Sequence, residues 1–330
     1  MASRPRPFDD GLTPRAAAAH RADLEPIVRR MFIDAMTADL VGAFEAEGIP
    51  CILLKGPAVV RWLYRPHEER SYLDLDLLVP ESQLARAERF LEGRSFRRFG
   101  RETIPGDWPR HAHNWISPQG AVLDLHYTLP GAGASPREVW DILSPQVDSM
   151  VVADRSVDVL GTGARALLVA IHAYKDGAAP QVRRDLLLAL ERVPRGVWEE
   201  AARLAARLQA QDAFAVGLER VPAGRELARS LDLPADRSTA VALRARGAPP
   251  LAVGIDWLFR TPGWRGKPTL VLRKVFPPRA FLRDWTPLAD RGPLGLAAAY
   301  VWRFVWVLWH AGPAYVAWRR ARRETRRTES

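Results

Sequence analysis

Two aspartates stand two residues apart in an apolar segment of the chain. The segment Tyr72–Val79 is Tyr-Leu-Asp-Leu-Asp-Leu-Leu-Val, so one leucine separates Asp74 from Asp76. This pattern predicts a strand, in which side chains at i and i+2 lie on the same face. Two like charges on a partly buried face repel each other unless a cation lies between them or water solvates them. The pair therefore predicts either a metal site or an exposed edge strand, and these residues alone favour neither.

A third carboxylate stands in a similar segment further along the chain. Ala121–Tyr127 predicts another strand, with Asp124 and His126 on one face. Three carboxylates around an open cavity suit Mg²⁺, which prefers oxygen ligands and keeps positions for water and substrate phosphates. Asp124 thus favours the metal interpretation of the first pair. We expect His126 to orient a carboxylate, to contact substrate, or to be a hydrogen-bonded structural histidine.

A lysine and a glycine lie where a predicted strand meets a predicted helix. The apolar run Cys51–Leu54 predicts the strand, and Pro57 favours a helix start because proline fits the first helical turn. Such a start can bind phosphate through its backbone N–H groups, and Lys55 adds a point charge. Lys-Gly-Pro is also an ordinary turn. Lysine is rare here, however, at four of the 48 basic residues, which makes Lys55 and Gly56 informative.

Two histidines precede the strand that carries Asp124. His111 and His113 are separated by one alanine, and they can contact substrate in the same cleft. A histidine pair without further nearby ligands does not make a zinc site. The sequence contains no Ser-His-Asp elbow, no Walker A motif and no GxGxxG motif.

These candidate residues require a small sheet with helices to position them. Apolar periodicity and turn residues predict helices over Asp23–Glu47, Pro57–Tyr64 and Glu81–Gly93, and further strands over Ser95–Thr103 and Asn114–Ser117. The last of these forms a hairpin with Ala121–Tyr127.

The predicted fold class is α+β, a small mixed sheet with flanking helices followed by a mainly helical C-terminal domain. We expect a flexible lead-in over residues 1–18, a catalytic domain over 19–160 and a helical domain with a basic tail over 161–330.

Composition describes a soluble globular protein. The 330 residues are 48% hydrophobic and 26% charged, which excludes a collagen-like or wholly disordered chain. The net charge is +10, but 44 of the 48 basic residues are arginine, a sign of coding bias that does not favour nucleic acid as a partner. Residues 290–330 carry eight arginines against three acids, a net of +5 away from the candidate site. Cys51 is the one cysteine, so no intramolecular disulfide forms, and a cytoplasmic location fits.

The order of these motifs is similar to that of the nucleotidyltransferase superfamily related to DNA polymerase β. More closely, the chain resembles the bacterial uncharacterised nucleotidyltransferase family. The matching residues are Leu53–Ala58, Tyr64, Arg70 four residues before Asp74, Asp74–Val79 and Leu123–Tyr127, with His172, Asp185, Leu186, Tyr300 and Arg303 further along the chain. The superfamily has Gly-Ser or Gly-Gly at the turn where this chain has Gly56-Pro57.

The resemblance implies a metal-dependent nucleotidyltransferase that moves a nucleoside monophosphate from an NTP to an unidentified acceptor. Asp74 and Asp76 would hold two Mg²⁺ (or Mn²⁺) ions, and Asp124 would complete the inner metal and help activate the acceptor hydroxyl. Lys55 and Arg70 would neutralise the triphosphate. Because genes of this family are thought to lie among clusters for modified peptides and surface polysaccharides, the acceptor implied is a modified peptide or a sugar-bearing substrate.

Two alternatives remain open. A glycosyltransferase also uses Asp-x-Asp to hold Mn²⁺ and a sugar nucleotide, but only one short predicted strand precedes Asp74. A binding protein with this fold and no turnover is the other alternative, docked to a partner or a membrane through its C-terminus. The segment Leu294–Trp318 approaches the length of a membrane span and precedes the basic cluster Arg319–Arg327, so residues 294–327 would make that peripheral contact. Against it, Arg303 interrupts the run and Pro313 is expected to break the helix, which favours a buried or half-buried helix.

Overall fold

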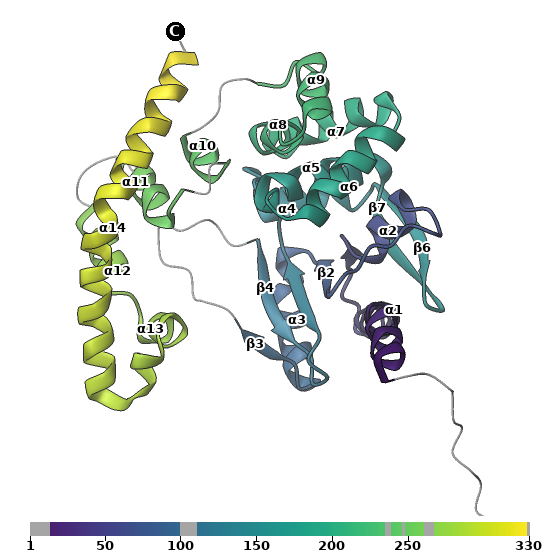
Figure 1. Cartoon of the computed structure of the whole chain (residues 1–330), viewed down its shortest axis with the longest axis horizontal. Helices are drawn as coiled ribbons and strands as arrows, with labels where there is room; N and C mark the ends of the chain where they lie inside the picture. Colours follow the sequence, from purple (N-terminus) through teal and green to yellow (C-terminus); the bar gives the residue numbers. More distant parts are fainter. Residues whose placement is uncertain (1–13, 100–110, 235–238, 246–247, 261–266, 329–330) are drawn as a thin grey trace, which may run out of the picture.

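The computed structural model describes residues 14–99, 111–234, 239–245, 248–260 and 267–328. A mixed sheet of seven strands lies at the centre of the larger part of the molecule, in the order β3-β4-β5-β2-β1-β7-β6 (Figure 1). The strands are β1 Ile52–Leu53, β2 Asp74–Leu78, β3 Arg97–Phe99, β4 Ala112–Ile116, β5 Val122–His126, β6 Val147–Val152 and β7 Arg155–Leu160.

Helices precede, cover and follow this sheet. Those interleaved with the strands are α1 Pro14–Ala46, α2 Pro57–Leu63, α3 Glu81–Gly93 and α4 Pro136–Leu143. The helices that follow the last strand are α5 Thr162–Asp176, α6 Pro180–Arg192, α7 Arg195–Arg207, α8 Gln211–Leu218, α9 Pro222–Ser230, α10 Thr239–Ala245, α11 Pro250–Arg260, α12 Lys267–Val275, α13 Arg279–Trp285, η1 Pro287–Asp290 and α14 Gly292–Thr328.

Strand pairing brings the two aspartate segments side by side. β2 and β5 are parallel, and their register places Asp76 opposite Asp124. β4 is antiparallel to β5 and places Asn114 opposite Asp124 on the other side. β1 is antiparallel to β2, so Lys55, which follows β1, lies toward the start of β2. Since neighbouring residues in register share a face, the polar side chains from these strands gather on one face of the sheet.

The two faces of the sheet pack against different helices. Leucines at alternate positions of β2 and β5 pack with Trp115 against apolar residues of α1 and α3. The opposite face contributes Leu54 and Leu78 to a larger cluster with α5–α9. α5 is buried along most of its length, which places it between the sheet and the outer helices. The polar face of the sheet is therefore the one that α5 covers.

The predicted fold class is confirmed, and most element positions agree with the structure. α3 spans Glu81–Gly93 as predicted, and α2 ends one residue earlier than predicted. α1 begins at Pro14 and not at Asp23, so residues 14–18, expected in the lead-in, are helical. Residues 1–13 and the end of the strand expected to reach Thr103 lie outside the described residues.

Three elements were missed by the sequence analysis. β6 and β7 form a hairpin at one edge of the sheet, and one residue of β6 is buried, so the apolar pattern of this strand is weak. α4 has a capping box, in which Ser135 and Glu138 exchange side-chain and backbone hydrogen bonds. This Ser-x-x-Glu signal is readable from sequence.

The C-terminal helices form small clusters of their own. Buried residues of α10 and α11 pack with one part of α14, and α13 and η1 pack with another. The predicted boundary between residues 160 and 161 stays a prediction, but α5–α9 share a core with the sheet, whereas α10–α14 pack mainly with one another.

The prediction that Pro313 breaks the last helix is wrong. α14 continues through it, because packing of Ala299 on one side of the proline and of Ala314 and Trp318 on the other outweighs one lost backbone hydrogen bond. The helix is also less covered than the buried or half-buried helix that we expected, since 22% of its most apolar window is buried.

Candidate active site

Three side chains from two parallel strands form the centre of the candidate site. Asp76 comes from β2, and Asp124 and His126 come from β5. One ligand atom of each lies within 4.8 Å of the others. The parallel register that places Asp76 beside Asp124 produces this group, with His126 two residues further along the same face.

Asp76 is the most deeply buried acid of the group, with 1% of its side chain exposed. Its Oδ1 accepts from Lys55 Nζ at 2.7 Å and from His126 Nε2 at 3.0 Å. A carboxylate only accepts, so Nε2 of His126 is the donor in this hydrogen bond. Burial alone would raise the pKa of Asp76, but the charge of Lys55 and the bond from His126 lower it well below its usual value. His126 thus takes the carboxylate-orienting role among those we expected.

Lys55 supplies positive charge to all three aspartates. Burial would lower the pKa of its ammonium, but the charges of Asp76, Asp74 and Asp124 and the hydrogen bond to Asp76 raise it above the ordinary value. Lys55 therefore stays charged, as its place beside the carboxylates requires. The rarity of lysine in the sequence correctly drew attention to this residue.

Asp74 lies at the start of β2, outside the tight group of three. Its side chain is partly buried, and burial together with the charge of Asp76 raises its pKa. Asp124 receives a hydrogen bond from Asn114 Nδ2, which comes from the neighbouring strand β4. Asn114 is a site residue that the sequence analysis did not single out. The feature that could have identified Asn114 is the register of the β4–β5 hairpin, which places it opposite Asp124.

These residues fit a divalent cation. Asp76 Oδ2 is buried and has no hydrogen-bond partner, so it retains lone pairs that a cation can bind. Asp124 offers further carboxylate oxygen beside it, and oxygen ligands are what Mg²⁺ prefers. The donor set of Asp76 and Asp124, with Asp74 next to them, therefore suits the metal that the sequence pattern predicts.

Arg70 has a different partner from the one we expected. Its guanidinium makes two hydrogen bonds of 2.8 Å to Asp185 on α6, and both side chains are buried. Tyr64 donates to the same carboxylate at 2.6 Å. This bidentate pair uses Nε and Nη2 of the guanidinium, and the phosphate contact of Arg70 stays a prediction. Arg70 joins the segment before β2 to α6.

The two histidines before β5 lie in different surroundings. The ring of His111 lies 5.3 Å from that of His126, next to the carboxylates. His113 pairs with Glu88 of α3 at 2.6 Å, on the opposite face of the sheet. Side chains alternate along β4, so Asn114 and not His113 lies on the face that carries Asp124, and the substrate contact of His113 stays a prediction.

α5 contributes His172 to the wall of the site. Burial and the nearby charge of Lys55 lower the pKa of His172 to about 4, so its ring is neutral near pH 7. Its Nε2 lies 3.6 Å from Asp176 one turn later on the helix. The sequence analysis noted His172 through the family resemblance alone, because the fold that brings α5 over the sheet is not visible from spacing.

The turn between β1 and α2 offers limited phosphate binding through its backbone. Gly56 has φ +59°, a conformation that favours glycine, and caps α2. Pro57 has no N–H, and the N–H of Ala58 already donates to Lys55 O at 3.3 Å. Among the residues of this turn, the Lys55 side chain is therefore the principal cationic group near the carboxylates.

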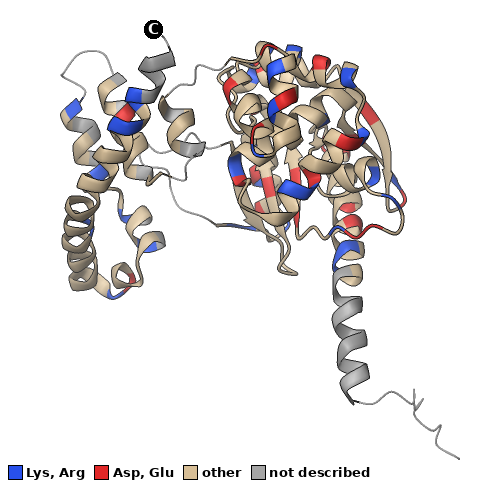
Figure 2. Ribbon diagram, turned by 45° about the horizontal axis from the view of Figure 1, so that its top comes forward, with Lys and Arg blue, Asp and Glu red and all other residues tan. Residues whose placement is uncertain are grey.

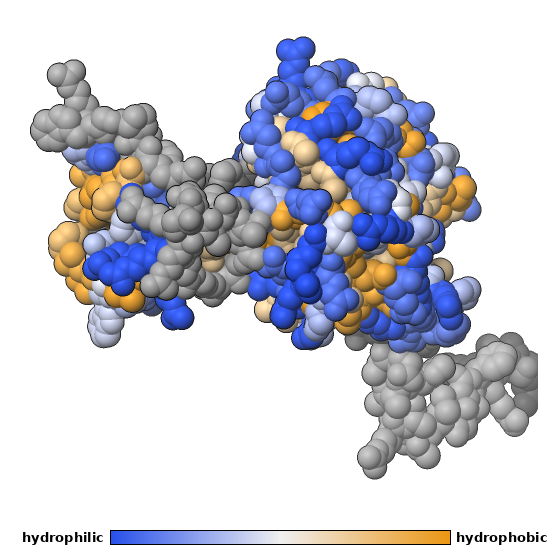
Figure 3. All heavy atoms as spheres, turned by 90° about the horizontal axis from the view of Figure 1, so that it is seen from above, coloured by the Kyte–Doolittle hydropathy of each residue, from blue (hydrophilic) through white to orange (hydrophobic). Residues whose placement is uncertain are grey.

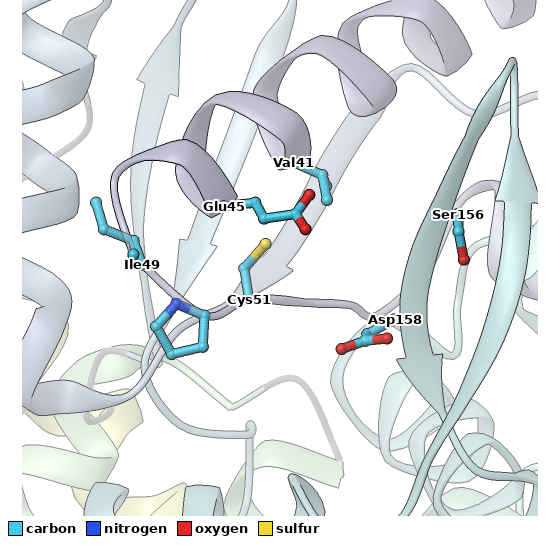
Figure 4. A pocket seen from close by; sticks show the side chains of 8 residues that line it. Val41, Glu45, Ile49, Cys51, Ser156 and Asp158 are labelled. Atoms are coloured by element: carbon cyan, nitrogen blue, oxygen red, sulfur yellow. The ribbon is translucent and has the colours of Figure 1, made fainter.

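A separate pocket of about 450 Å³ lies at the other end of β1 (Figure 4). Glu45, Cys51 and Asp158 line it, and Figure 4 shows their side chains converging from α1, the segment before β1, and β7. Burial and the two acids raise the pKa of the Cys51 thiol to about 12. This half-buried cysteine is therefore protonated at neutral pH.

Comparison with known proteins identifies a family. A family model described as "Uncharacterised nucleotidyltransferase" matches residues 13–222, which include every residue of the candidate site. A search among curated proteins gave no match.

Several solved structures resemble the chain distantly. The antibiotic-resistance factor ANT(2″)-Ia is 17% identical over 54% of this chain and 94% of its own, with a TM-score of 0.38. An antigenic nucleotidyltransferase-like protein from Paracoccidioides brasiliensis is 16% identical over 63% and 95%, also with a TM-score of 0.38. The lincosamide antibiotic adenylyltransferase LnuA, solved with lincomycin, is 16% identical over 47% and 93%, with a TM-score of 0.32. Matches at these identities and TM-scores say nothing of the substrates of this chain.

Proposed function

The chain belongs to the family of uncharacterised nucleotidyltransferases, and we propose that it transfers a nucleoside monophosphate from an NTP to an acceptor hydroxyl or phosphate. An oxygen of the acceptor attacks the α-phosphorus, the bond between the α-phosphorus and the bridging oxygen breaks, and pyrophosphate leaves with that electron pair. The observation that carries the proposal is the group of Asp76, Asp124 and Lys55, which joins buried carboxylates to a positive charge.

Divalent metal is part of the proposal. Asp76, Asp124 and Asp74 would hold Mg²⁺ or Mn²⁺, and the family resemblance suggests two ions. When bound, the metal would neutralise phosphate charge and polarise the reacting oxygens. The unpartnered Oδ2 of Asp76 supports this assignment, because a buried carboxylate oxygen without a partner is costly unless something binds it.

The residues around the metal ligands have distinct proposed roles. His126 donates to Asp76 and fixes the direction of that carboxylate, and Asn114 does the same for Asp124. Lys55 would bind the triphosphate while remaining close to the aspartates. Asp124 would take the proton of an acceptor hydroxyl, because it is less buried than Asp76 and is held in place by Asn114.

Arg70 and His113 have no place in this mechanism. Arg70 is a positioning residue, since its pair with Asp185 holds α6 against the segment that leads into β2. His111 remains a candidate for substrate contact through its place beside His126. The acceptor proposed is a modified peptide or a sugar-bearing molecule, on the strength of the family resemblance. A glycosyltransferase activity has no support from the family match.

Nucleotide binding and transfer with labelled NTPs test the proposal. The chain is incubated with each α-³²P-labelled NTP, Mg²⁺ and a cell extract as the source of acceptor. We expect labelled product together with unlabelled pyrophosphate from the wild type. Removal of one metal carboxylate, by Asp124→Asn, is expected to lower the rate on the order of a thousandfold.

A matched control uses an acid outside the site. Asp141→Asn changes an exposed carboxylate on α4 and is expected to leave transfer unchanged. Equal NTP affinity and equal metal dependence in the wild type and in an Asp74→Ala/Asp76→Ala variant would refute the proposal. Preferential binding of a sugar nucleotide would favour the glycosyltransferase alternative instead.

A further inference from the structure

The last helix, α14, exposes apolar side chains where a surface helix of a soluble protein exposes charged ones. Such a helix normally packs apolar residues inward and exposes charged ones. On α14 the outward face carries Leu294, Val301, Leu308, Trp309 and Val316, with exposed fractions of 60–87%. Figure 2 shows α14 almost free of charged residues over most of its length, with basic residues toward its C-terminal end. The exposed face is therefore apolar from Leu294 to Val316.

The charge within this run is turned inward. Arg303 is the one Asp, Glu, Lys or Arg between Gly292 and Trp318, and it is 4% exposed. Its guanidinium lies over the rings of Trp285 and Trp306, at 5.0 and 4.8 Å from their centroids. Cation–π contacts of this kind make burial of an arginine tolerable. The helix thus encloses its charge and exposes its apolar side chains.

A neighbouring helix extends the apolar surface. Val271, Leu272 and Phe276, on and just after α12, are about half exposed. With Phe304 of α14 and Leu258 of α11 they line an open apolar groove of about 540 Å³. Figure 3 shows the hydrophobic atoms gathered on the outer side of these C-terminal helices, at the left of the view. We call the exposed residues of α12 and α14 together the C-terminal apolar face. Patches of this extent mark an interaction site.

Basic residues border the C-terminal apolar face at both ends. Arg319, Arg320 and Arg323 are exposed at the C-terminal end of α14. Arg283 and Arg291 are exposed near its N-terminal end, beside Asp290. The apolar stretch of residues 294–316 between them is roughly 35 Å long at 1.5 Å per residue. An apolar face with a basic border complements an apolar surface that carries negative charge.

An apolar face can bind a second copy of the chain or a lipid membrane, and the charge pattern distinguishes between these two partners. Two copies of the chain paired through α14 would bring arginines against arginines, whether the helices ran parallel or antiparallel. An anionic lipid bilayer supplies both an apolar surface and negative charge. Its acyl region receives the leucine, valine and tryptophan side chains, and its headgroups neutralise the arginines. We propose that the C-terminal apolar face docks this protein on the surface of an anionic membrane.

The packing of α14 fits a helix that lies on the membrane surface better than a helix that spans the membrane. The inner side of the helix is bound along its length, through Ala299 and Arg303 to α13 and through Ala314 and Trp318 to α10 and α11. Trp318 also donates to the buried Asp256 of α11 at 3.1 Å. A helix crossing the bilayer would have to leave these partners or carry Asp256 into hydrocarbon. The helix therefore lies in the plane of the membrane with its outer face in the lipid.

Co-sedimentation of the full chain with vesicles tests this inference. Two vesicle types are used, phosphatidylcholine alone and phosphatidylcholine with phosphatidylglycerol. We expect strong binding to the second type and weak binding to the first. Changing Arg319, Arg320 and Arg323 to Gln is expected to lower partitioning onto the anionic vesicles on the order of a hundredfold, at about fivefold for each arginine.

A variant of the apolar face supplies the second arm. Leu308→Glu/Trp309→Glu alters two exposed side chains, so the variant is expected to keep the melting temperature of the wild type and to lose binding to both vesicle types. The matched control is Val151→Glu/Leu187→Glu, which changes exposed apolar residues of β6 and α6 and is expected to bind as the wild type does. These residues lie outside the candidate active site, so nucleotide binding is expected to be unchanged in every variant.

Four results would overturn the inference. The first is wild-type protein that stays in solution with anionic vesicles at low salt. The second is equal binding by the Leu308→Glu/Trp309→Glu variant. The third is a stable dimer in light scattering without lipid that this variant converts to a monomer, which would assign the face to a second copy of the chain. Bound protein that high salt and alkaline carbonate do not release would instead indicate a helix that crosses the membrane, contrary to surface docking.

Discussion

Replacement of Lys55 by methionine tests the electrostatics of the site most sharply. Lys55 Nζ lies 2.7 Å from Asp76, whose side chain is 1% exposed, and methionine keeps much of the volume while removing the charge. Loss of one partner from a buried ion pair costs about 3–5 kcal/mol, because the other charge is left uncompensated. We therefore expect Lys55→Met to lower the free energy of unfolding by about that amount when no metal is present.

Divalent metal is expected to restore part of this stability. A cation bound at Asp76 and Asp124 replaces the lost positive charge, and a ligand at a hundred times its Kd contributes about 2.7 kcal/mol. Urea unfolding with and without Mg²⁺ measures both effects, and we expect a larger gain from Mg²⁺ in the variant than in the wild type. Lys175→Met is the matched control, because Lys175 is paired with Asp176 at the surface at 3.7 Å, where loss of a pair costs about 0–1 kcal/mol.

The pH dependence of the same experiment has a defined sign. The folded pKa of Asp76 is lowered, so the unfolded chain binds the proton more readily, and the stabilisation from Lys55 is present above the unfolded pKa and declines as pH falls below it. The difference between the wild type and Lys55→Met should therefore shrink in acid. A variant as stable as the wild type at neutral pH without metal, and indifferent to Mg²⁺, would refute the reasoning.

Three other changes have expected outcomes. Arg70→Met breaks the buried pair with Asp185, and we expect denaturant unfolding to show a loss of about 3–5 kcal/mol in the free energy of unfolding. Nucleotide affinity, measured by calorimetry under folding conditions, is expected to stay within a few-fold of the wild type. A large loss of affinity with little loss of stability would indicate instead that Arg70 binds phosphate. Asn114→Ala removes the donor that orients Asp124 and is expected to lower metal affinity or transfer rate on the order of 10–100-fold. Steady-state kinetics equal to those of the wild type would show that Asn114 does not orient Asp124 for the reaction. The thiol of Cys51, with a pKa of about 12, is expected to react with a disulfide reagent near pH 8 on the order of a hundredfold or more slowly than a free thiol and to accelerate steadily toward higher pH. A fast reaction at pH 8 in folded protein would contradict the raised pKa of this thiol.

The sequence pattern predicted the strands that carry the acids, because alternation and the i, i+2 rule act locally. Asp74 and Asp76 lie on one face of β2, and strand pairing places Asp124 opposite Asp76. Proline at the first turn similarly located α2 at Pro57. These are properties of a few neighbouring residues, and the structure adds to them only the pairing of strands.

What the sequence could not predict depends on contacts between distant segments. Arg70 contacts Asp185, which lies 115 positions further along the chain, and no spacing rule connects them. His113 lies on the far face of the sheet because β4 and β5 pair with Asn114 opposite Asp124, a register that composition does not reveal. The exposed face of α14 was misjudged for the same reason, since hydropathy does not state which side of a helix is covered.

The central claim is that Asp76 and Asp124 hold a metal–nucleotide complex for nucleotidyl transfer. The most direct measurement is an anomalous-difference map from crystals grown with Mn²⁺ and an NTP analogue whose α–β bridge resists cleavage. The account predicts Mn²⁺ bound by Asp76 and Asp124, with the triphosphate next to Lys55. Mn²⁺ and nucleotide bound at another part of the chain, or nucleotide bound at this site without Mn²⁺ at these two carboxylates, would contradict it.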